Sequence, residues 1–262
     1  METIENLVSN AEAWRVVAWR LSLVAELTQE ETAFLQNCDI AVRSFSEGED
    51  VFVEGDTQSN IYVCLEGWGA RYRVLIEGQR QVVDFILPGS IFGAQVDEYG
   101  QHSISAGALN NMTLAVVSET CLRQIAKDYA NVASRIAIAL ADESVRLLER
   151  VISLGRRDAE QRLGHLLLEL NERLEAFGEA QEMTVRLPVS QKEVADFLGL
   201  TSVHVSRTLG QMRDKGLIDY DNEYVTIRKG EELAELSEYE SEQVNTSAIP
   251  LQLQRVLLNC GS

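Results

Sequence analysis

Five small or basic residues in the C-terminal third of the chain fall on one face of a predicted helix: Ser202, Val203, Ser206, Arg207 and Gly210. A helix with such a face fits the major groove of B-DNA, where base edges and phosphates are open to its side chains. This chemistry is non-covalent recognition of a polyanion and needs no nucleophile or general base. The residue types and their spacing therefore predict DNA binding.

Two helices and a tight turn within residues 187–218 are expected to position this face. Ser190 and Glu193 have the spacing of a capping box at the start of the first helix. Gly199 supplies the sharp turn, and Thr201 can cap the second helix. Apolar residues at helical spacing form the predicted buried side, namely Val194, Phe197, Leu198, Val205, Leu209 and Met212. The segment is predicted to be a helix-turn-helix.

The charge of the whole chain opposes binding to a polyanion, because 41 acidic residues outnumber 23 basic residues and the net charge is −18. Residues 1–155 carry 11 basic and 22 acidic side chains, residues 156–229 carry 11 and 13, and residues 230–262 carry 1 and 6. The predicted DNA-binding part is therefore nearly neutral. It can bind DNA if its cations gather on one side, namely Lys192, Arg207, Arg213, Lys215, Arg228 and Lys229. We expect modest non-specific affinity and reliance on a dimer.

Residues 38–118 have the pattern of an all-β domain. Short apolar or alternating runs recur at intervals of about ten residues and are punctuated by Gly48, Gly55, Gly67, Gly78 and Gly89. This pattern predicts a sandwich or barrel. Residues 1–37 are predicted to be mainly helical, most clearly at 21–36, where Thr28 can cap the second half.

Residues 119–155 contain neither glycine nor proline before Gly155 and predict one long helix that ends there. Heptad spacing along it predicts a dimer seam that includes Leu140, Ser144, Leu147, Val151 and Leu154. The alternative is a helix that packs on its own β domain. We favour the dimer because a helix-turn-helix usually reads a palindromic site with two copies.

The remaining segments complete a winged DNA-binding domain at 156–230. Residues 157–178 predict an amphipathic helix, with His165 as a partly buried scaffold residue. Alternating residues around the turn-prone pair 221–222 predict a two-stranded wing. Residues 231–262 begin as an acidic helix and then lose periodicity, and the sequence leaves open whether this tail packs.

The composition indicates a globular protein of two domains, with 262 residues of which 45% are hydrophobic. No apolar run approaches the ~20 residues that a membrane span needs, and the N-terminus has no secretory signal. We therefore expect a cytoplasmic protein. The four cysteines show no C-x-x-C spacing, so we interpret them as reduced thiols without a metal and expect adventitious oxidation only at the last of Cys38, Cys64, Cys121 and Cys260.

The order of these parts and five motifs resemble the CRP/FNR superfamily of bacterial transcription regulators. The motifs are FSEGEDVFVEGD at 45–56, IYVCLEG at 61–67, LPGSIFG at 87–93, RRDAEQRL at 156–163 and VADFLGLTSVHVSRTL at 194–209. The resemblance covers about residues 20–230. It implies an α+β fold with a β-roll (a jelly roll like that of cyclic-nucleotide-binding domains), a long dimerisation helix and a C-terminal winged helix-turn-helix. It also implies a homodimer on palindromic double-stranded DNA that contacts RNA polymerase.

Departures from the family pattern remove the usual ligands of the β-roll. Cyclic-AMP-binding members place a glutamate on the ribose and an arginine on the phosphate, where this chain has Ala94 and His102. Ala94 cannot accept a hydrogen bond, and His102, which we expect to be an exposed loop residue, is a weaker substitute for arginine. Because each lost contact costs about 1.5–3 kcal/mol, cyclic AMP is not expected to bind.

Other cofactors of the family are not expected either. The iron–sulfur cluster of oxygen-sensing members needs an N-terminal cysteine cluster, and residues 1–37 contain no cysteine. Haem would have only His102 and the cysteines as axial ligands in the β-roll and long helix. We predict no cofactor and leave the effector open.

The resemblance also assigns roles within the second helix of the helix-turn-helix. Arg207 matches the family arginine that donates to guanine O6 and N7, and Ser206 matches the small residue before it. Val203 replaces the usual glutamate, so we expect it to meet a thymine methyl and to change the half-site. His204 is expected at a phosphate. Further DNA contacts are expected from Ser190, Gln191, Lys192, Thr201 and Ser202.

We therefore expect a homodimeric, sequence-specific DNA-binding transcription regulator. The main alternative is a ligand- or protein-binding module whose helix-turn-helix no longer reads DNA. The near-neutral DNA-binding part and the acidic tail favour this alternative. An enzyme is disfavoured, because the sequence has no nucleophile–base–acid set, phosphate loop or metal motif and only three histidines.

Overall fold

The computed structural model describes residues 10–24, 26–38, 40–57, 60–180, 183–221 and 223–240. Contacts divide them into two compact units. The first unit contains the described residues up to 69 and residues 86–146, and the second contains residues 70–85 and the described residues from 147 onward. A hairpin from the middle of the predicted β-roll is thus grouped with the helix-turn-helix.

An antiparallel four-stranded sheet forms the centre of the first unit, in the order β1 (Ile40–Phe45), β8 (Met112–Val117), β3 (Ile61–Glu66) and β6 (Ile91–Phe92). Strands β2 (Asp50–Phe52) and β7 (Ser105–Ala108) pair with each other. Strands β6 and β7 are absent from the sequence-based expectation, because runs of two and four residues carry too little periodicity. The all-β prediction for this segment is otherwise confirmed.

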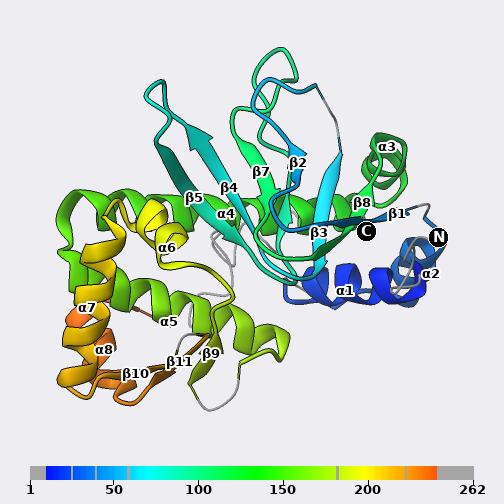
Figure 1. Cartoon of the computed structure of the whole chain (residues 1–262). Helices are drawn as coiled ribbons and strands as arrows, with labels where there is room; N and C mark the ends of the chain where they lie inside the picture. The colour runs from blue at the N-terminus through cyan, green and yellow to red at the C-terminus, as the bar shows by residue number, and fades with distance from the viewer. Residues whose placement is uncertain are drawn as a thin grey trace, which may run out of the picture. The chain divides into compact units, whose positions relative to one another are not determined.

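Two helices precede the sheet. Helix α1 (Asn10–Ser22) packs against β1 and β3, and α2 (Gln29–Asn37) follows it (Figure 1). The predicted helical stretch 21–36 is interrupted between them. Thr28 caps α2, and its hydroxyl accepts a hydrogen bond from the Glu31 backbone at 3.1 Å, as the sequence predicts.

The single helix predicted for 119–155 is two helices in the structure. Helix α3 (Glu119–Asp128) ends at Tyr129, whose φ of −134° and ψ of 63° leave the helical region. The Tyr129 ring stacks on Phe34 of α2, with centroids 3.8 Å apart. Helix α4 (Ala130–Arg156) then runs past Gly155. A tertiary contact, not a helix-breaking residue type, accompanies the interruption.

The second unit contains most of β4 (Gly69–Val74) and of β5 (Arg80–Ile86), followed by α5 (Ala159–Phe177), α6 (Gln191–Leu198), α7 (Ser202–Asp214) and α8 (Gly230–Ser237). Its small sheet has the order β10 (Ile218–Asp221), β11 (Tyr224–Ile227) and β9 (Thr184–Arg186), all antiparallel. The predicted two-stranded wing is confirmed and has a third strand, β9, which pairs Val185 with Val225. Helix α8 confirms that the acidic tail begins as a helix, whereas residues 241–262 lie outside the described part.

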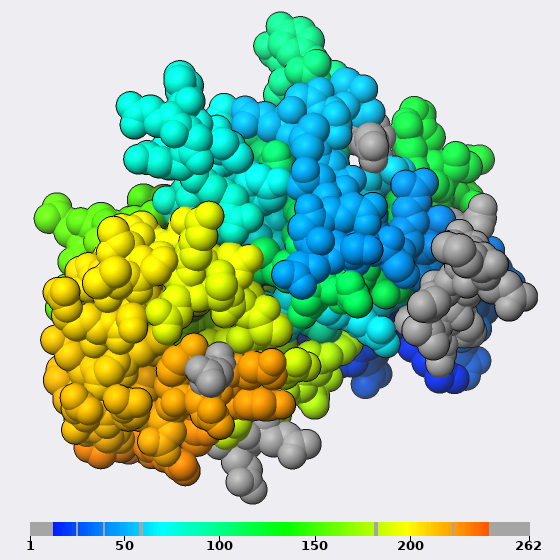
Figure 2. Space-filling model, in the orientation of Figure 1, coloured from blue at the N-terminus to red at the C-terminus, as the bar shows by residue number. Residues whose placement is uncertain are grey.

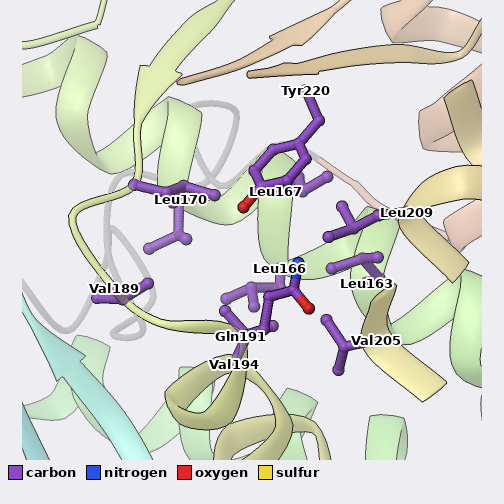
Figure 3. A pocket seen from close by; sticks show the side chains of 11 residues that line it. Leu163, Leu166, Leu167, Leu170, Val189, Gln191, Val194, Val205, Leu209 and Tyr220 are labelled. Carbon is purple, nitrogen blue, oxygen red and sulfur yellow. The ribbon is translucent and has the colours of Figure 1, made fainter. Parts of the chain in front are cut away.

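A small apolar cavity lies among α5, α6, α7 and β10 (Figure 3). Its volume of about 20 Å³ is enough for about one water molecule, so it cannot hold a nucleotide. Figure 3 shows the leucines of α5 between Tyr220 on one side and Gln191 and Val194 on the other. The cavity is therefore part of the hydrophobic core that fixes the two helices of the helix-turn-helix to α5. None of the helices in the described ranges is both long and apolar enough to cross a membrane.

Candidate nucleic-acid interface

Local capping interactions fix both helices of the predicted helix-turn-helix. The Glu193 carboxylate accepts from the Ser190 backbone N–H at 2.6 Å, and the Ser190 hydroxyl accepts from the Glu193 backbone at 3.3 Å, which confirms the capping box. Gly199 ends α6 in the left-handed region, at φ 65°, where residues other than glycine are strained. The Thr201 hydroxyl accepts from the His204 backbone at 3.2 Å and caps α7.

The two faces of α7 divide as the sequence predicts. Val205, Leu209 and Met212 are buried, while residues 202–204, 206 and 207 are exposed. Val203 is 69% exposed, so its apolar side chain does not serve the core. In Figure 2 the yellow part of the surface, to which α6 and α7 belong, is open to solvent. The candidate contact residues of α7 are therefore brought together on one accessible face.

The six cations that the sequence predicts for the DNA-binding side fall into two groups. Three of the six cations named from the sequence form ion pairs, namely Lys215 with Glu160 (2.6 Å), Arg228 with Asp219 (2.6 Å) and Lys229 with Glu232 (2.8 Å). In contrast, Lys192, Arg207 and Arg213 are exposed and form no ion pair with any other described residue. The three side chains of the second group can therefore contact DNA phosphates or base edges, and no intramolecular ion pair has to break.

Two of the predicted contact residues are engaged within the protein. The Ser190 hydroxyl donates to a carboxylate oxygen of Glu193 at 2.8 Å. Gln191 is half-buried and its side chain lines the apolar cavity beside Val194 (Figure 3). Ser190 and Gln191 therefore have less freedom to reach a phosphate than Lys192, the neighbouring exposed cation.

Residues of β5 contact α6 through an ion pair, a hydrogen bond and a ring stack. Arg80 Nε lies 3.3 Å from Asp196 Oδ2, and the Gln81 amide donates to the Asp196 carbonyl at 2.7 Å. The ring of Phe85 stacks on Phe197, with centroids 4.7 Å apart. Sequence reasoning missed these contacts, because about 115 residues separate the partners and no local pattern links them.

A buried network of charges supports the same region. Asp84 accepts from Arg71 at 3.1 Å and from Arg173 at 3.2 Å. Glu169 accepts from Arg173 at 3.2 Å and from Arg150 at 3.3 Å. Burial disfavours the charged form of Arg173, but the carboxylates of Asp84 and Glu169 outweigh it and raise its pKa above the ordinary value. Removing either carboxylate would leave a buried arginine without that partner, which is strongly destabilising.

His165 is buried, as the sequence predicts, and His102 is buried against expectation. His165 packs edge-on against Tyr239, with centroids 4.9 Å apart, and burial followed by the charge of Arg157 lowers its pKa. His102, expected to be exposed, is only 2% exposed, because its ring stacks on Phe52 at 3.8 Å. Burial lowers the pKa of His102, opposed by Asp56 and by a backbone hydrogen bond with Gln95.

The exposed apolar residues of α4 do not coincide with the seam predicted from the heptad pattern. Ser144 and Val151 of that seam are exposed, whereas Leu140, Leu147 and Leu154 are half-buried. Leu148 is 64% exposed and Val151 is 68% exposed, and Val145 and Ile152 complete an exposed apolar face. Of these four exposed residues only Val151 belongs to the predicted seam, because two neighbouring heptad registers fit the same apolar run.

The arrangement defines a winged helix-turn-helix DNA-binding unit in a chain that also carries a β-roll. Comparison with known families agrees with this class. Residues 161–236 match the family described as a Crp-like helix-turn-helix domain, and residues 42–129 match the cyclic nucleotide-binding domain. The chain belongs to the CRP/FNR family of DNA-binding transcription regulators.

Individual relatives support the same assignment. The chain is 35% identical to the nitrogen fixation regulation protein FixK of Bradyrhizobium diazoefficiens, over 66% of this chain and 72% of that protein. It is 31% identical to FixK of Rhizobium meliloti, over 74% of this chain and 86% of that protein. The solved structure of FixK2 from Bradyrhizobium japonicum superposes with a TM-score of 0.70 at 26% identity, covering 78% of this chain and all of that chain. Both curated relatives are named as regulation proteins, which agrees with the regulator that the sequence predicts.

Proposed function

We propose that the chain acts as a homodimer that reads a palindromic DNA site with Arg207 of each copy. The observation that carries the proposal is the position of Arg207, on the exposed face of α7 and without an ion pair among the described residues. An unpaired guanidinium in the first half of a recognition helix can donate its fork to guanine O6 and N7. Lys192 and Arg213, on either side of it in the sequence, supply sequence-independent attraction to phosphates.

The exposed face of α4 supports the dimer. Val145, Leu148, Val151 and Ile152 follow spacings of three and four residues, so they lie on one side of the helix. Leu148 and Val151 are 64% and 68% exposed, and a contiguous exposed apolar face of this kind is typical of a helix–helix contact with a second copy. We place the centre of the seam at Leu148 and Val151, with Ser144 and the half-buried Leu140, Leu147 and Leu154 at its edges.

Within the first unit, the β-roll core supports a regulator that does not bind cyclic AMP. His102 stands where the family pattern places the phosphate-binding arginine, and its ring stacks on Phe52. The rings of Tyr62 and Phe92 fill the space beside Phe52. A Cβ at Gly93 would lie 2.7 Å from the Tyr62 ring, so the packing there is already tight. An aromatic cluster thus occupies the core at the position where the family pattern places its phosphate ligand.

The proposal extends to the setting in which the protein acts. As in other regulators of this class, we place it in the cytoplasm, on promoter DNA beside RNA polymerase. The proposed DNA contacts and dimer seam require no cofactor.

Fluorescence anisotropy with the full chain and a labelled duplex tests the absence of a cyclic-AMP response. We expect binding to an inverted-repeat site that weakens steeply with salt, and an affinity unchanged by cyclic AMP. An increase of tenfold or more on adding cyclic AMP would contradict the proposal for the β-roll. Absence of salt-dependent binding to every duplex tested would favour the module that has lost DNA reading.

A further inference from the structure

Two cysteine sulfur atoms lie close together in the first unit. Cys38 Sγ and Cys121 Sγ are 2.7 Å apart, although 83 residues separate them in the sequence. A disulfide bond joins sulfurs at about 2.05 Å, so a small movement brings the pair to bonding distance. The sequence-based interpretation of four idle thiols took no account of this pair, because spacing along the chain gives no indication of it.

Helix termini hold both cysteines in place. Cys38 follows α2, and its backbone N–H donates to the carbonyls of Phe34 at 3.0 Å and Leu35 at 3.2 Å. Cys121 lies in the first turn of α3, where its backbone N–H donates to the Ser118 hydroxyl at 3.2 Å. The Trp14 indole also donates to the Cys38 carbonyl at 3.1 Å. The approach of the two sulfurs is therefore set by the backbone as well as by side-chain rotation.

The two sulfurs differ in access and electrostatics. Cys121 is 5% exposed, whereas Cys38 is partly exposed. The N-terminal turn of α3 favours negative charge on Cys121 through the helix dipole. This combination suits a reaction in which a small oxidant first reacts with Cys38, and the Cys121 sulfur then attacks the oxidised Cys38 sulfur.

We propose that Cys38 and Cys121 form a redox-active dithiol that a hydroperoxide oxidises to an intramolecular disulfide. Cys38 gives up its thiol proton, its thiolate attacks one oxygen of hydrogen peroxide, and the O–O bond breaks; the leaving hydroxide takes up that proton and becomes water, while Cys38 becomes a sulfenic acid. The Cys121 sulfur then attacks the Cys38 sulfur, and the sulfenic hydroxyl takes up the Cys121 thiol proton and leaves as the second water. Two thiols and one hydrogen peroxide give one disulfide and two waters, and the two electrons come from the sulfurs.

The bond would tie the end of α2 to the start of α3. The ring of Phe34 in α2 already stacks on Tyr129, at the junction of α3 and α4. Oxidation therefore fastens the N-terminal helices to the segment that leads into α4. A crosslink that closes a loop of 83 residues restricts the unfolded chain, so the oxidised protein should melt at a higher temperature.

Peptide mapping of the full chain tests the proposal, in a Cys260→Ser background that removes the cysteine outside the described residues. Trypsin places Cys38, Cys64 and Cys121 on separate peptides, residues 21–43, 44–71 and 81–123. The reduced protein is treated with equimolar hydrogen peroxide, its remaining thiols are alkylated, and it is digested without reductant. We expect 21–43 linked to 81–123, two hydrogens lighter than the separate peptides, with the Cys64 peptide alkylated.

Matched variants sharpen the test. Cys64 is buried in the apolar cluster that contains Phe52, Tyr62 and Phe92, so Cys64→Ser should leave the linked peptide and the rise in melting temperature unchanged. In Cys121→Ala, a cyclic-diketone probe should trap the sulfenic acid on the 21–43 peptide. The proposal is wrong if both peptides of the parent protein are fully alkylated after peroxide treatment, or if the linked pair forms only between two copies. The parent peptide map decides the matter even where a variant folds poorly.

Discussion

Arg207 and Lys192 are both exposed cations of the helix-turn-helix, but they lie on different helices. We expect them to contact different parts of the DNA. Arg207 belongs to α7, and the exposed face of this helix also carries the smaller residues Val203 and Ser206. Lys192 belongs to the first turn of α6. The guanidinium fork is suited to a base edge, and the ammonium is suited to a phosphate.

Replacing Arg207 with Ala should therefore abolish sequence preference while retaining non-specific binding. The loss of a bidentate base contact should cost about 1–3 kcal/mol per half-site on the preferred duplex. Lys192→Ala is the matched control, because loss of a phosphate contact weakens preferred and scrambled duplexes alike and lowers the salt slope by about one. Anisotropy titrations on both duplexes measure the difference. Unchanged preference in Arg207→Ala would show that another face of α7 reads the bases.

The buried His102 should make the folded protein sensitive to mild acid. Burial lowers its pKa below the ordinary 6.5, so the unfolded chain takes up the proton first as the pH falls. The stability associated with neutral His102 is therefore complete above about pH 6.5 and is lost as the pH falls below it. His102→Phe keeps a ring against Phe52 and removes the titration.

We expect His102→Phe to lose less unfolding free energy than the wild type between pH 7.5 and pH 5.5, as measured by urea denaturation. His165, whose pKa is also lowered, leaves a residual pH dependence in both proteins. His204→Gln, at an exposed position, serves as the control and should behave like the wild type. An equal or larger loss in His102→Phe would show that His102 is not the group that titrates.

At the scale of elements, the long helix α4 separates residues that pack inward from residues that face solvent. Leu147 is half-buried, whereas its neighbour Leu148 is largely exposed. A charge at Leu148 should therefore disrupt a contact with a second copy while leaving the fold intact. A charge at Leu147 should affect both stability and association.

Leu148→Glu should shift the protein towards monomer in sedimentation at micromolar concentration, with little change in melting temperature. Val74→Glu is a matched control, because Val74 is an exposed apolar residue of β4 outside the proposed seam. It should leave the apparent mass unchanged. A dimer of full stability in Leu148→Glu would place the interface elsewhere on the chain.

Local signals account for the elements that the sequence predicted well. The caps at Thr28, Ser190 and Thr201 depend on residues within three positions of each other, and each forms as expected. The positive φ at Gly199 likewise follows from the residue type. Interactions of this range can be recognised in a single sequence.

Longer-range features could not be recognised in the same way. Asp84 and Arg173 form an ion pair across 89 residues, and Cys38 approaches Cys121 across 83. The break at Tyr129 accompanies a stack on Phe34, which no local pattern reveals. The exposed face of α4 depends on which heptad register packs inward, and that is decided by the tertiary structure. Each of these features depends on residues that only the tertiary structure brings together.

At the scale of the whole molecule, the net negative charge is compatible with DNA binding because exposed cations lie within the helix-turn-helix. The net charge of −18 is spread over the chain, and within the helix-turn-helix three exposed cations remain outside ion pairs with other described residues. So small a number favours weak non-specific binding, because each phosphate contact contributes only a limited salt-dependent attraction. Two copies on one duplex double the number of contacts, so specific binding by this chain should depend on the dimer.

Selection of bound duplexes from a random pool by the full chain tests this account most directly. We predict an inverted repeat whose half-sites are centred about 34–36 Å apart, with a guanine that loses its enrichment when Arg207→Ala is used in the same selection. The selection should proceed without cyclic AMP. Enrichment of a single, non-repeated site, or of the same repeat by wild type and Arg207→Ala, would contradict a dimer that reads DNA through Arg207.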